Sequence, residues 1–247
     1  MDYYGFCTRD YLILGQVAFN KKLSVLEIGI GTGSTARHII GQVNKFCGVD
    51  ISEELISWLS VTYKNSKNVS LYALDVCSSI SLRQKFDLIY SLDTLEHVVS
   101  PLDYFYFISA HLADEGIGIV VFPNESEHKH HGVTRFRSKA VFSDLICSAG
   151  LKIESFYEIK KTLWHIFIES CLWKMPKMIL SRDKNSPQTF EQTTSFKIIQ
   201  SNHFRTKILA SYAKIAVVLA RMFPLYNFSK VSKNIDNKNL FVCLKRR

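Results

Sequence analysis

The segment VLEIGIGTGS, at residues 25–34, constrains the fold of this chain more than any other stretch. It places an apolar run, the acid Glu27 and the glycines Gly29, Gly31 and Gly33 directly before a helical pattern. Glycine has no Cβ, so its backbone adopts positive φ and a ligand can lie close against it. A helix start adds N–H groups and the positive end of the helix dipole. The segment therefore predicts a strand, a turn and a ligand site, and the charge of Glu27 favours a cationic or amine-bearing ligand over a bare phosphate.

Strand and helix patterns alternate through the first 160 residues. The predicted strands are 24–28, 46–51, 69–74, 86–91, 117–122 and 151–159, with Pro123 ending the fifth. The predicted helices are 34–41, a helix capped by Ser52, a helix from Pro101 to about 112, and 139–149, which Gly150 stops. This alternation predicts an α/β fold of parallel strands joined by right-handed crossovers. Ligands of such sheets bind beyond the carboxyl ends of the strands.

The charge of the chain is divided unevenly. The 247 residues carry a formal net charge of +9, yet residues 1–160 hold 15 Lys/Arg against 18 Asp/Glu, and residues 161–247 hold 16 against 4. An anionic partner should therefore be sought in the last third. Six scattered cysteines without a C-x-x-C pair, and an N-terminus unlike a signal peptide, predict a cytoplasmic protein with reduced thiols.

Two apolar helix patterns dominate the last third, at 163–180 and 204–228. Charged residues interrupt the first and Pro224 breaks the second, so neither offers the ~18 uninterrupted apolar residues of a membrane span. Residues 239–244 (NLFVCL) then predict a final short strand.

Polar residues close the predicted strands in an order that suits a nucleoside. Asp50 ends the second strand about 20 residues after the glycine turn, where a carboxylate can accept both hydroxyls of a ribose. Asp75 ends the third strand and can accept from the exocyclic amine of a base. Ser91 and Leu92 follow the fourth strand, over the reacting end of the ligand. Four strand ends with matching chemistry are a stronger indication than any one motif.

The glycine turn alone leaves a second interpretation open. Gly31, Gly33 and Ala36 also satisfy G-x-G-x-x-A, which is a dinucleotide fingerprint. Tyr157 and Lys161 have the spacing of a dehydrogenase Tyr/Lys couple, but they fall on a predicted strand, where a four-residue step does not bring them together. A nicotinamide-dependent oxidoreductase is therefore the alternative.

The chain resembles the class I S-adenosylmethionine-dependent methyltransferases, in particular the branch of quinone-biosynthesis and small-molecule O-methyltransferases. The matching segments are LEIGIGTGS, GVDIS, LYALDV, FDLIYSLDTLEHVVSP, GIGIVVFPN and FSDLICSAGLKIESF. The resemblance implies S-adenosyl-L-methionine as cofactor, with its methionine part held by Glu27 and the glycine turn. It implies the ribose at Asp50 beside Ile51, and the adenine at Asp75 and Val76.

The resemblance also implies an architecture. It predicts a Rossmann-like, mostly parallel seven-stranded sheet with helices on both faces, in which residues 239–244 form the reversed seventh strand. That strand normally follows the sixth through a short hairpin, but here about 80 residues separate them. We therefore expect a methyltransferase domain at 1–160 and 237–247, with a basic, apolar helical insertion at 161–236 between strands six and seven.

Two sets of residues are candidates for a general base. His97 follows the fourth strand, where it either takes a proton or orients its loop through Glu96 or the backbone. His128, His130 and His131 follow the fifth strand with Glu125 and Glu127. They could bind a metal, but a loop that closes over the substrate is the favoured interpretation, with His131 as its candidate, and we assign no metal.

The insertion has two interpretations of equal weight. Lys207, Lys214 and Arg221 are seven residues apart and form one stripe along a helix, opposite a broad apolar side. Such a helix suits an anionic membrane surface, and it also suits a lid packed on the domain. A nucleic-acid partner is disfavoured because the segment is too apolar and lacks arginine clusters with interleaved aromatic residues.

Together these features predict methyl transfer to a small or amphiphilic acceptor. The hypothesis is a hydroxyl on a lipid-linked, quinone-like or glycan molecule, modified in the cytoplasm by an enzyme peripheral to the inner membrane face. A non-catalytic cofactor-binding scaffold is a third possibility, besides the oxidoreductase.

Overall fold

The computed structural model describes residues 11–78, 82–124, 136–167, 170, 222–231, 233–236 and 238–247. The chain divides into two compact units. Unit 1 comprises residues 1–18, 33–37 and 161–227, and unit 2 comprises residues 19–32, 38–160 and 228–247.

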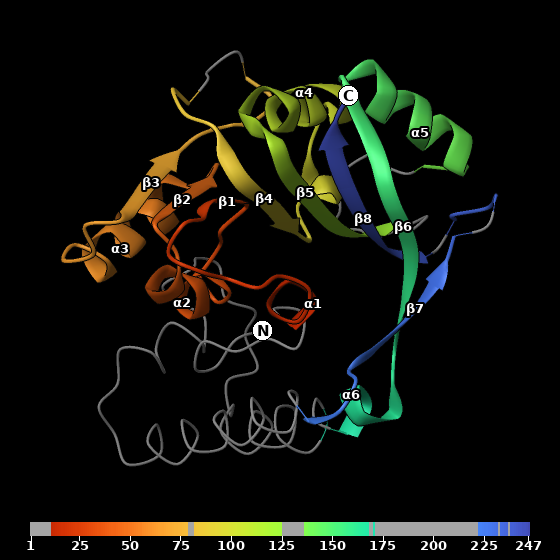
Figure 1. Cartoon of the computed structure of the whole chain (residues 1–247), viewed down its shortest axis with the longest axis horizontal. Coiled ribbons are helices and arrows are strands. Elements are labelled where there is room, and N and C mark those ends of the chain that lie inside the picture. The colour runs from red at the N-terminus through yellow and green to blue at the C-terminus, as the bar shows by residue number, and fades with distance from the viewer. Residues whose placement is uncertain are drawn as a thin grey trace, which may run out of the picture. The chain divides into compact units, whose positions relative to one another are not determined.

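The described residues form one mixed sheet with the strand order β3-β2-β1-β4-β5-β8-β6-β7 (Figure 1). The strands are β1 Ser24–Ile28, β2 Lys45–Asp50, β3 Val69–Ala73, β4 Phe86–Leu92, β5 Leu112–Asn124, β6 Leu151–Lys161, β7 Tyr226–Lys230 and β8 Lys238–Arg246. Strands β1 to β5 pair in parallel. Strand β8 lies antiparallel between β5 and β6, so that Phe241 stands opposite both Val121 and Tyr157. The Rossmann-like class and the reversed C-terminal strand are thus confirmed.

The sheet has one strand more than the seven that we expected. Strand β7 overlaps the last three residues of the segment predicted as helix at 204–228, and it pairs with the outer edge of β6. The bonds Thr162 N to Leu225 O and Val231 N to Phe156 O bracket this pair and make it antiparallel. The ring centroid of Phe228 lies 6.0 Å from that of Tyr157 and 5.5 Å from that of Phe241. These cross-strand aromatic contacts stabilise a strand where the local pattern favoured a helix.

Local capping signals set the helix boundaries. The helices are α1 Tyr11–Leu14, α2 Ala36–Ile39, α3 Glu53–Thr62, α4 Pro101–His111, α5 Lys139–Ser148 and α6 Leu163–Phe167, with short 3-10 turns η2 Ile40–Gln42 and η3 Leu95–His97. Ser52 caps α3 as predicted, because its Oγ accepts from Leu55 N at 3.2 Å. Ser100 caps α4 just before Pro101, and Gly150, at φ 75°, ends α5.

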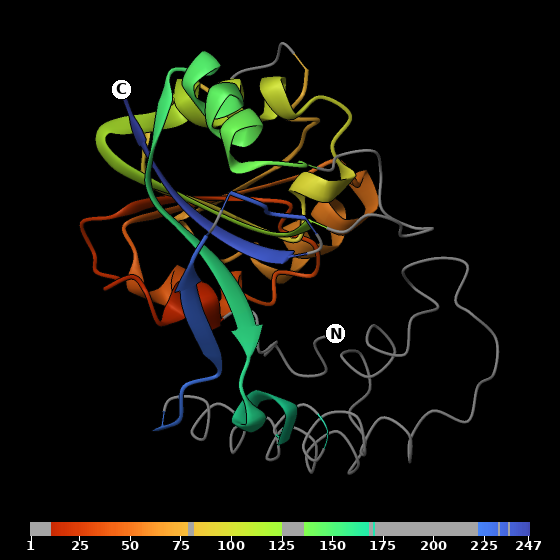
Figure 2. The ribbon, with the colours of Figure 1, turned by 90° about the vertical axis from the view of Figure 1, so that its right-hand side faces the viewer.

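Helices α4 and α5 cover one face of the sheet (Figure 2). Phe142 of α5 lies at the centre of an aromatic cluster, with its ring centroid 4.8–5.8 Å from those of Phe105, Phe122, Phe136 and Phe156. The buried residues of α3, Ile56 and Leu59, lie outside this cluster, and α3 contacts β2 and β3. The sheet therefore has helices on both faces.

Strand β5 runs past Pro123, which we had expected to end it. Strand β4 stops opposite Val121, so Pro123 has a strand neighbour on one side only, where it pairs with Asn239 of β8. Proline is tolerated in such a position because its missing N–H is not needed there. The prediction failed because the decisive partner lies more than 100 residues away.

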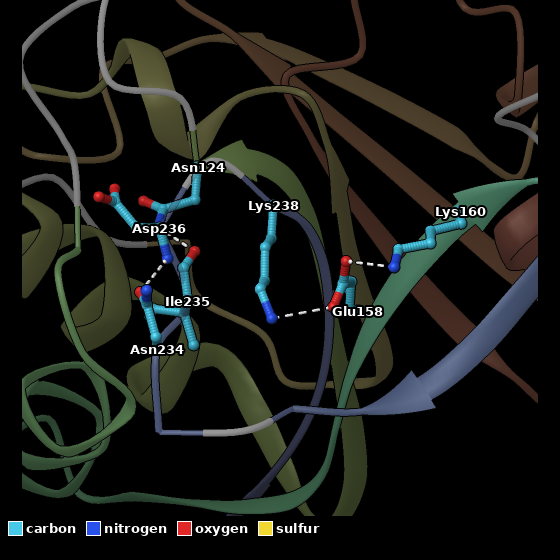
Figure 3. Close-up of polar contacts among 7 residues, drawn as sticks. All are labelled: Asn124, Glu158, Lys160, Asn234, Ile235, Asp236 and Lys238. Carbon is cyan, nitrogen blue, oxygen red and sulfur yellow. Dashed lines mark hydrogen bonds and ion pairs between the residues drawn. The ribbon is translucent and has the colours of Figure 1, made fainter.

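Asn124, the last residue of β5, fastens two other segments to the sheet (Figure 3). Its side chain is fully buried and donates from Nδ2 to Phe136 O and to Ile235 O, both at 2.7 Å. Its Oδ1 accepts from Phe136 N at 2.8 Å. One amide thus ties the lead into α5 and the lead into β8 to the carboxyl end of β5.

An ion-pair cluster joins β6 to β8 next to Asn124 (Figure 3). Glu158 lies 2.9 Å from Lys238 Nζ and 3.2 Å from Lys160 Nζ. The hydrogen bond from Lys238, and the second lysine, hold the pKa of the Glu158 carboxyl below its ordinary value. Partly exposed pairs of this kind contribute about 0.2–1 kcal/mol each.

Helix α6 coincides with the start of the helix predicted at 163–180; the rest of that segment, except Ser170, lies outside the described residues. Across the parts of the chain that the structure describes, no helix has the length and apolar character to cross a bilayer.

His111, at the end of α4, is a structural histidine. It is buried, its Nδ1 lies 2.7 Å from Phe107 O, and its Nε2 accepts from Leu82 N at 2.8 Å. Since Nε2 accepts, the ring is neutral with its proton on Nδ1. Burial lowers the pKa of His111, and the nearby Lys85 lowers it further.

We expect His111 to make the stability depend on pH. Because its pKa is lower in the folded state, its stabilising contribution is complete above the unfolded value near 6.5 and is lost as the pH falls below that value. The free energy of unfolding should fall by up to about 1.4 kcal/mol per pH unit from this group. Urea unfolding of the wild type and of His111→Leu at pH 7.5 and 5.5 measures it. His97→Gln, at an exposed histidine, is the control that should keep the wild-type pH dependence; an unchanged dependence in His111→Leu would contradict the assignment.

Candidate cofactor site

The turn after β1 folds over the end of β2. Gly29 N and Ile30 N both donate to Val49 O, at 2.9 and 3.1 Å. Gly29 and Gly31 have φ values of 73° and 52°, in the left-handed region that favours glycine. The turn thus brings its own N–H groups to the tip of β2, where Asp50 lies.

Asp50 is oriented by the glycine turn itself. Its Oδ2 accepts from Gly31 N at 2.9 Å, and its Oδ1 accepts from Ser52 N at 3.0 Å. A carboxylate has about four acceptor positions, so these two bonds fix its plane and leave capacity for two hydroxyls. The carboxylate is half-buried, which keeps it accessible to a ligand.

Gly29 is required by a close contact with the loop after β4. A Cβ at Gly29 would lie 2.1 Å from Thr94 Oγ1 and 2.9 Å from Thr94 Cγ2. The Thr94 hydroxyl lies 3.3 Å from Ile28 O and 3.1 Å from Leu92 O. Thr94 therefore joins the ends of β1 and β4, and the absence of a side chain at Gly29 makes this possible. Thr94 has no local signal in the sequence, because Ile28, whose carbonyl it bonds, lies 66 residues away.

Asp93, which we did not include among the site residues, carries the backbone strain of this loop. It is a non-glycine residue with φ 50°, and its N–H donates to Val121 O at 2.9 Å. Aspartate is among the residues that tolerate this conformation. Strain of this kind gathers at functional sites, and here it turns the chain sharply after β4 so that Thr94 reaches β1.

The ends of β2 and β3 carry an apolar and a polar group side by side. Ile51 is 73% exposed, which is unusual for a large apolar residue next to a buried strand. Asp75 is exposed, and its Oδ1 accepts from Cys77 N at 2.9 Å. Leu74 N donates to Asp50 O at 2.8 Å, which holds the two strand ends together. Val76 is buried in the core, so its side chain supports the site from beneath.

Glu27 lies between the neighbouring strands, opposite Gly48 on β2 and Tyr90 on β4. It is only 4% exposed, so its carboxyl group lies within the sheet, one residue before the end of β1. Ser91 is buried as well, and burial raises the pKa of the Tyr104 hydroxyl. Ser91 can therefore meet a ligand through its backbone only, whereas Leu92 is half-buried at the strand tip.

Of the remaining candidates, His97 lies on the same loop as Thr94, whereas the others are not brought to this site by the described residues. His97 is exposed at the end of η3, and its backbone N–H donates to Thr94 O at 2.9 Å. His131, with His128, His130 and both nearby acids, lies outside the described residues. Gly33 has φ 69° and belongs to unit 1. No group of three or more His, Cys, Asp or Glu in the described part of the chain is arranged to hold a metal.

The geometry fits a nucleoside-bearing cofactor. It offers an oriented carboxylate at Asp50, an exposed apolar surface at Ile51 and a further acid at Asp75. A Cβ built on Gly31 meets nothing within 4 Å, so open space adjoins the Asp50 carboxylate. An oxidoreductase couple at Tyr157 and Lys161 is not supported, because both residues lie on β6 and the Tyr157 ring packs against Phe228.

Comparison with known proteins agrees with this geometry. A family model described as a methyltransferase domain matches residues 4–151. No curated protein sequence matches the chain.

Several solved structures share the fold at low sequence identity. A phosphoethanolamine N-methyltransferase 2 from Haemonchus contortus, in complex with phosphomonomethylethanolamine and S-adenosylhomocysteine, aligns with a TM-score of 0.57 and 16% identity, over 97% of this chain and 52% of that one. The [4+2]-cyclase SpnF aligns with a TM-score of 0.58 and 13% identity, over 97% and 81%. A putative sarcosine dimethylglycine methyltransferase from Galdieria sulphuraria aligns with a TM-score of 0.54 and 14% identity, over 97% and 83%. At such identities these likenesses concern the fold alone.

Two glycine variants should separate stability from cofactor binding. In Gly29→Ala the new methyl group clashes with Thr94 and the alanine must adopt a positive φ, so we expect a loss of roughly 2–4 kcal/mol of stability. Gly31→Ala meets open space, so it should lose only about 1–2 kcal/mol from its φ, while its methyl group lowers the affinity for S-adenosylhomocysteine at least tenfold. Thermal unfolding and calorimetric titration measure the two effects.

Gly41→Ala is the matched control, because its Cβ would meet nothing within 4 Å and its φ is not positive. It should change neither quantity. If Gly31→Ala binds the nucleoside as tightly as the wild type, the cofactor does not approach this turn.

Proposed function

The chain belongs to the methyltransferase-domain family, and from that premise we propose that it methylates a hydroxyl on an amphiphilic acceptor. The acceptor would be a lipid-linked, quinone-like or glycan molecule. The enzyme is a methyltransferase of the S-adenosylmethionine-dependent class with a Rossmann-like fold.

The residues at the ends of β1, β2 and β3 fit that cofactor. The glycine turn and Glu27 would hold its methionine part, the Asp50 carboxylate its ribose hydroxyls, and Ile51 with Asp75 its adenine. When bound, S-adenosylmethionine supplies an electrophilic methyl group on a sulfonium. The single observation that carries the assignment is the bond from Gly31 N to Asp50 Oδ2, because it fixes the ribose-binding carboxylate against the turn.

The remaining work of this chain is to position the acceptor and remove its proton. Holding the nucleophile in line accounts for most of the rate in such reactions. We assign the role of general base, which accepts this proton, to His97, an exposed residue just beyond the tip of β4. A positioned base of this kind contributes about 10²–10⁴-fold.

An apolar patch in unit 1 supports an amphiphilic acceptor. Leu163, Trp164, Ile166 and Phe167 of α6 are between 43% and 84% exposed, and Met222 is 67% exposed. The ring of Trp164 stacks on that of Phe223, with the centroids 4.1 Å apart. Contiguous exposed apolar groups mark interaction sites. Together with the basic excess of residues 161–247, this patch supports docking at the anionic inner face of a membrane.

Two other functions are distinguished by their products. An amine acceptor would yield N-methylated product, and the amine methyltransferases of the same fold make this the first alternative to examine. A cofactor-binding scaffold would bind the nucleoside and transfer nothing; one fold relative is described as a cyclase, so the fold alone does not specify methyl transfer.

Incubation with methyl-labelled S-adenosylmethionine and a cell lipid extract tests the reaction. We expect label in a lipid-soluble product carrying an O-methyl group. Asp50→Ala should weaken cofactor binding at least tenfold, because a charged hydrogen-bond acceptor is worth about 1.5–3 kcal/mol. His97→Gln should lower kcat about 10²-fold or more without changing cofactor affinity. Asp144→Asn, on the exposed side of α5, is the control that should match the wild type. Label found only in water-soluble amines would contradict the acceptor class.

Flotation with lipid vesicles tests the membrane surface separately. The wild type should float with vesicles that contain anionic phosphatidylserine and not with pure phosphatidylcholine. The double variant Leu163→Ser/Ile166→Ser should reduce flotation at least fivefold, while Val61→Ser, at an equally exposed apolar residue of unit 2, should not. Equal behaviour of wild type and double variant would exclude α6 as the docking element.

A further inference from the structure

A second pocket lies in unit 2, on the β6 side of the sheet. Its volume is about 450 Å³, and it is lined from the first turns of α5, from β6 and from the end of β7. Figure 1 shows these three elements at one edge of the sheet, with β6 passing alongside α5. None of the lining residues belongs to the cofactor set. The volume is within the range of small-molecule sites.

The pocket carries more positive than negative charge. Lys139, the first residue of α5, and Lys230, the last residue of β7, both line it. The positive end of the α5 dipole adds to the charge at Lys139. Among the described residues that line the pocket, Glu154 is the single acid, and it is paired with Lys245 of β8 at 3.6 Å. An anion in the pocket therefore meets two lysines and one acid that is itself ion-paired with Lys245.

Hydroxyl groups and an apolar floor complete the lining. Ser143, Ser155 and Tyr157 supply donors that suit phosphate oxygens. Phe156, 6% exposed, forms part of the floor, and Lys139 Nζ lies 5.9 Å from the centroid of its ring. This distance is within the range of a cation–π contact, which favours a position of the lysine over the ring.

We propose that this pocket binds a phosphomonoester, with the phosphate between Lys139 and Lys230 and the organic part against Phe156. Two ammonium groups balance a dianion, and lysine is a common phosphate ligand. The volume exceeds that of a phosphate ion alone, so the pocket has space for the group that the phosphate carries. The phosphate belongs either to a soluble metabolite or to the headgroup of a phosphomonoester lipid. This site does not depend on the methyl acceptor proposed above.

Titration of the full-length protein with glycerol 3-phosphate, followed by calorimetry, tests the site. Lys139→Gln and Lys230→Gln should each weaken binding about tenfold or more. Lys152→Gln, at an exposed lysine of β6 that does not line the pocket, should bind like the wild type. All three residues are exposed, so the variants should keep the wild-type melting temperature and the wild-type affinity for S-adenosylhomocysteine. That affinity separates failure of this pocket from failure of the cofactor site.

Vesicles distinguish the two sources of the phosphate. If a lipid supplies it, vesicles with phosphatidic acid should bind better than vesicles with phosphatidylserine at equal charge, and Lys139→Gln should remove the difference. If a metabolite supplies it, glycerol 3-phosphate binds while the two vesicles behave alike. The proposal is overturned if neither probe binds, or if Lys152→Gln weakens binding as much as the two pocket variants do.

Discussion

The cofactor site depends on close packing between the turn after β1 and the loop after β4. The turn after β1 has no side chain at Gly29, and the Thr94 hydroxyl fills that volume and joins Ile28 O to the end of β4. With the turn held there, Gly31 N reaches the carboxylate of Asp50. Orientation of Asp50 is therefore a consequence of packing between β1 and β4, and not of β2 alone. Preorganised acceptors of this kind bind without paying for their own ordering.

Features decided by neighbouring residues could be predicted from the sequence. Strand β1 has the predicted bounds, because a short apolar run before glycines has few alternatives. Ser52 caps α3 through a bond to a residue three positions on. The reversed strand β8 was also predictable, but from the family resemblance of residues 20–160 and the last ten, since nothing local to residues 239–244 indicates the direction in which they pair.

Features decided by distant partners could not be predicted. Pro123 was expected to end β5, yet its tolerance depends on where β4 stops and on pairing with Asn239. Strand β7 overlaps an apolar pattern that suits a helix equally well, and the contacts of Phe228 with the rings of Tyr157 and Phe241 favour the strand. The left-handed φ of Asp93 has only a weak local signal, which is the tolerance of aspartate for that conformation. In each case long-range contacts, and not local periodicity, decide the local structure.

The lysines of the last third that the structure describes on β7 and β8 have different partners. Lys238 and Lys245 face Glu158 and Glu154 across β6 and β8, so their charges serve the sheet. Lys230 lines the pocket beside Lys139, which comes from the nearly neutral part of the chain. Net charge thus indicates that an anion is to be expected, but the pairing of each lysine decides where it can bind. For the described residues, that criterion selects the pocket at the edge of β6 as an anion site, and it leaves the apolar patch of α6 to be explained by hydrophobic contact.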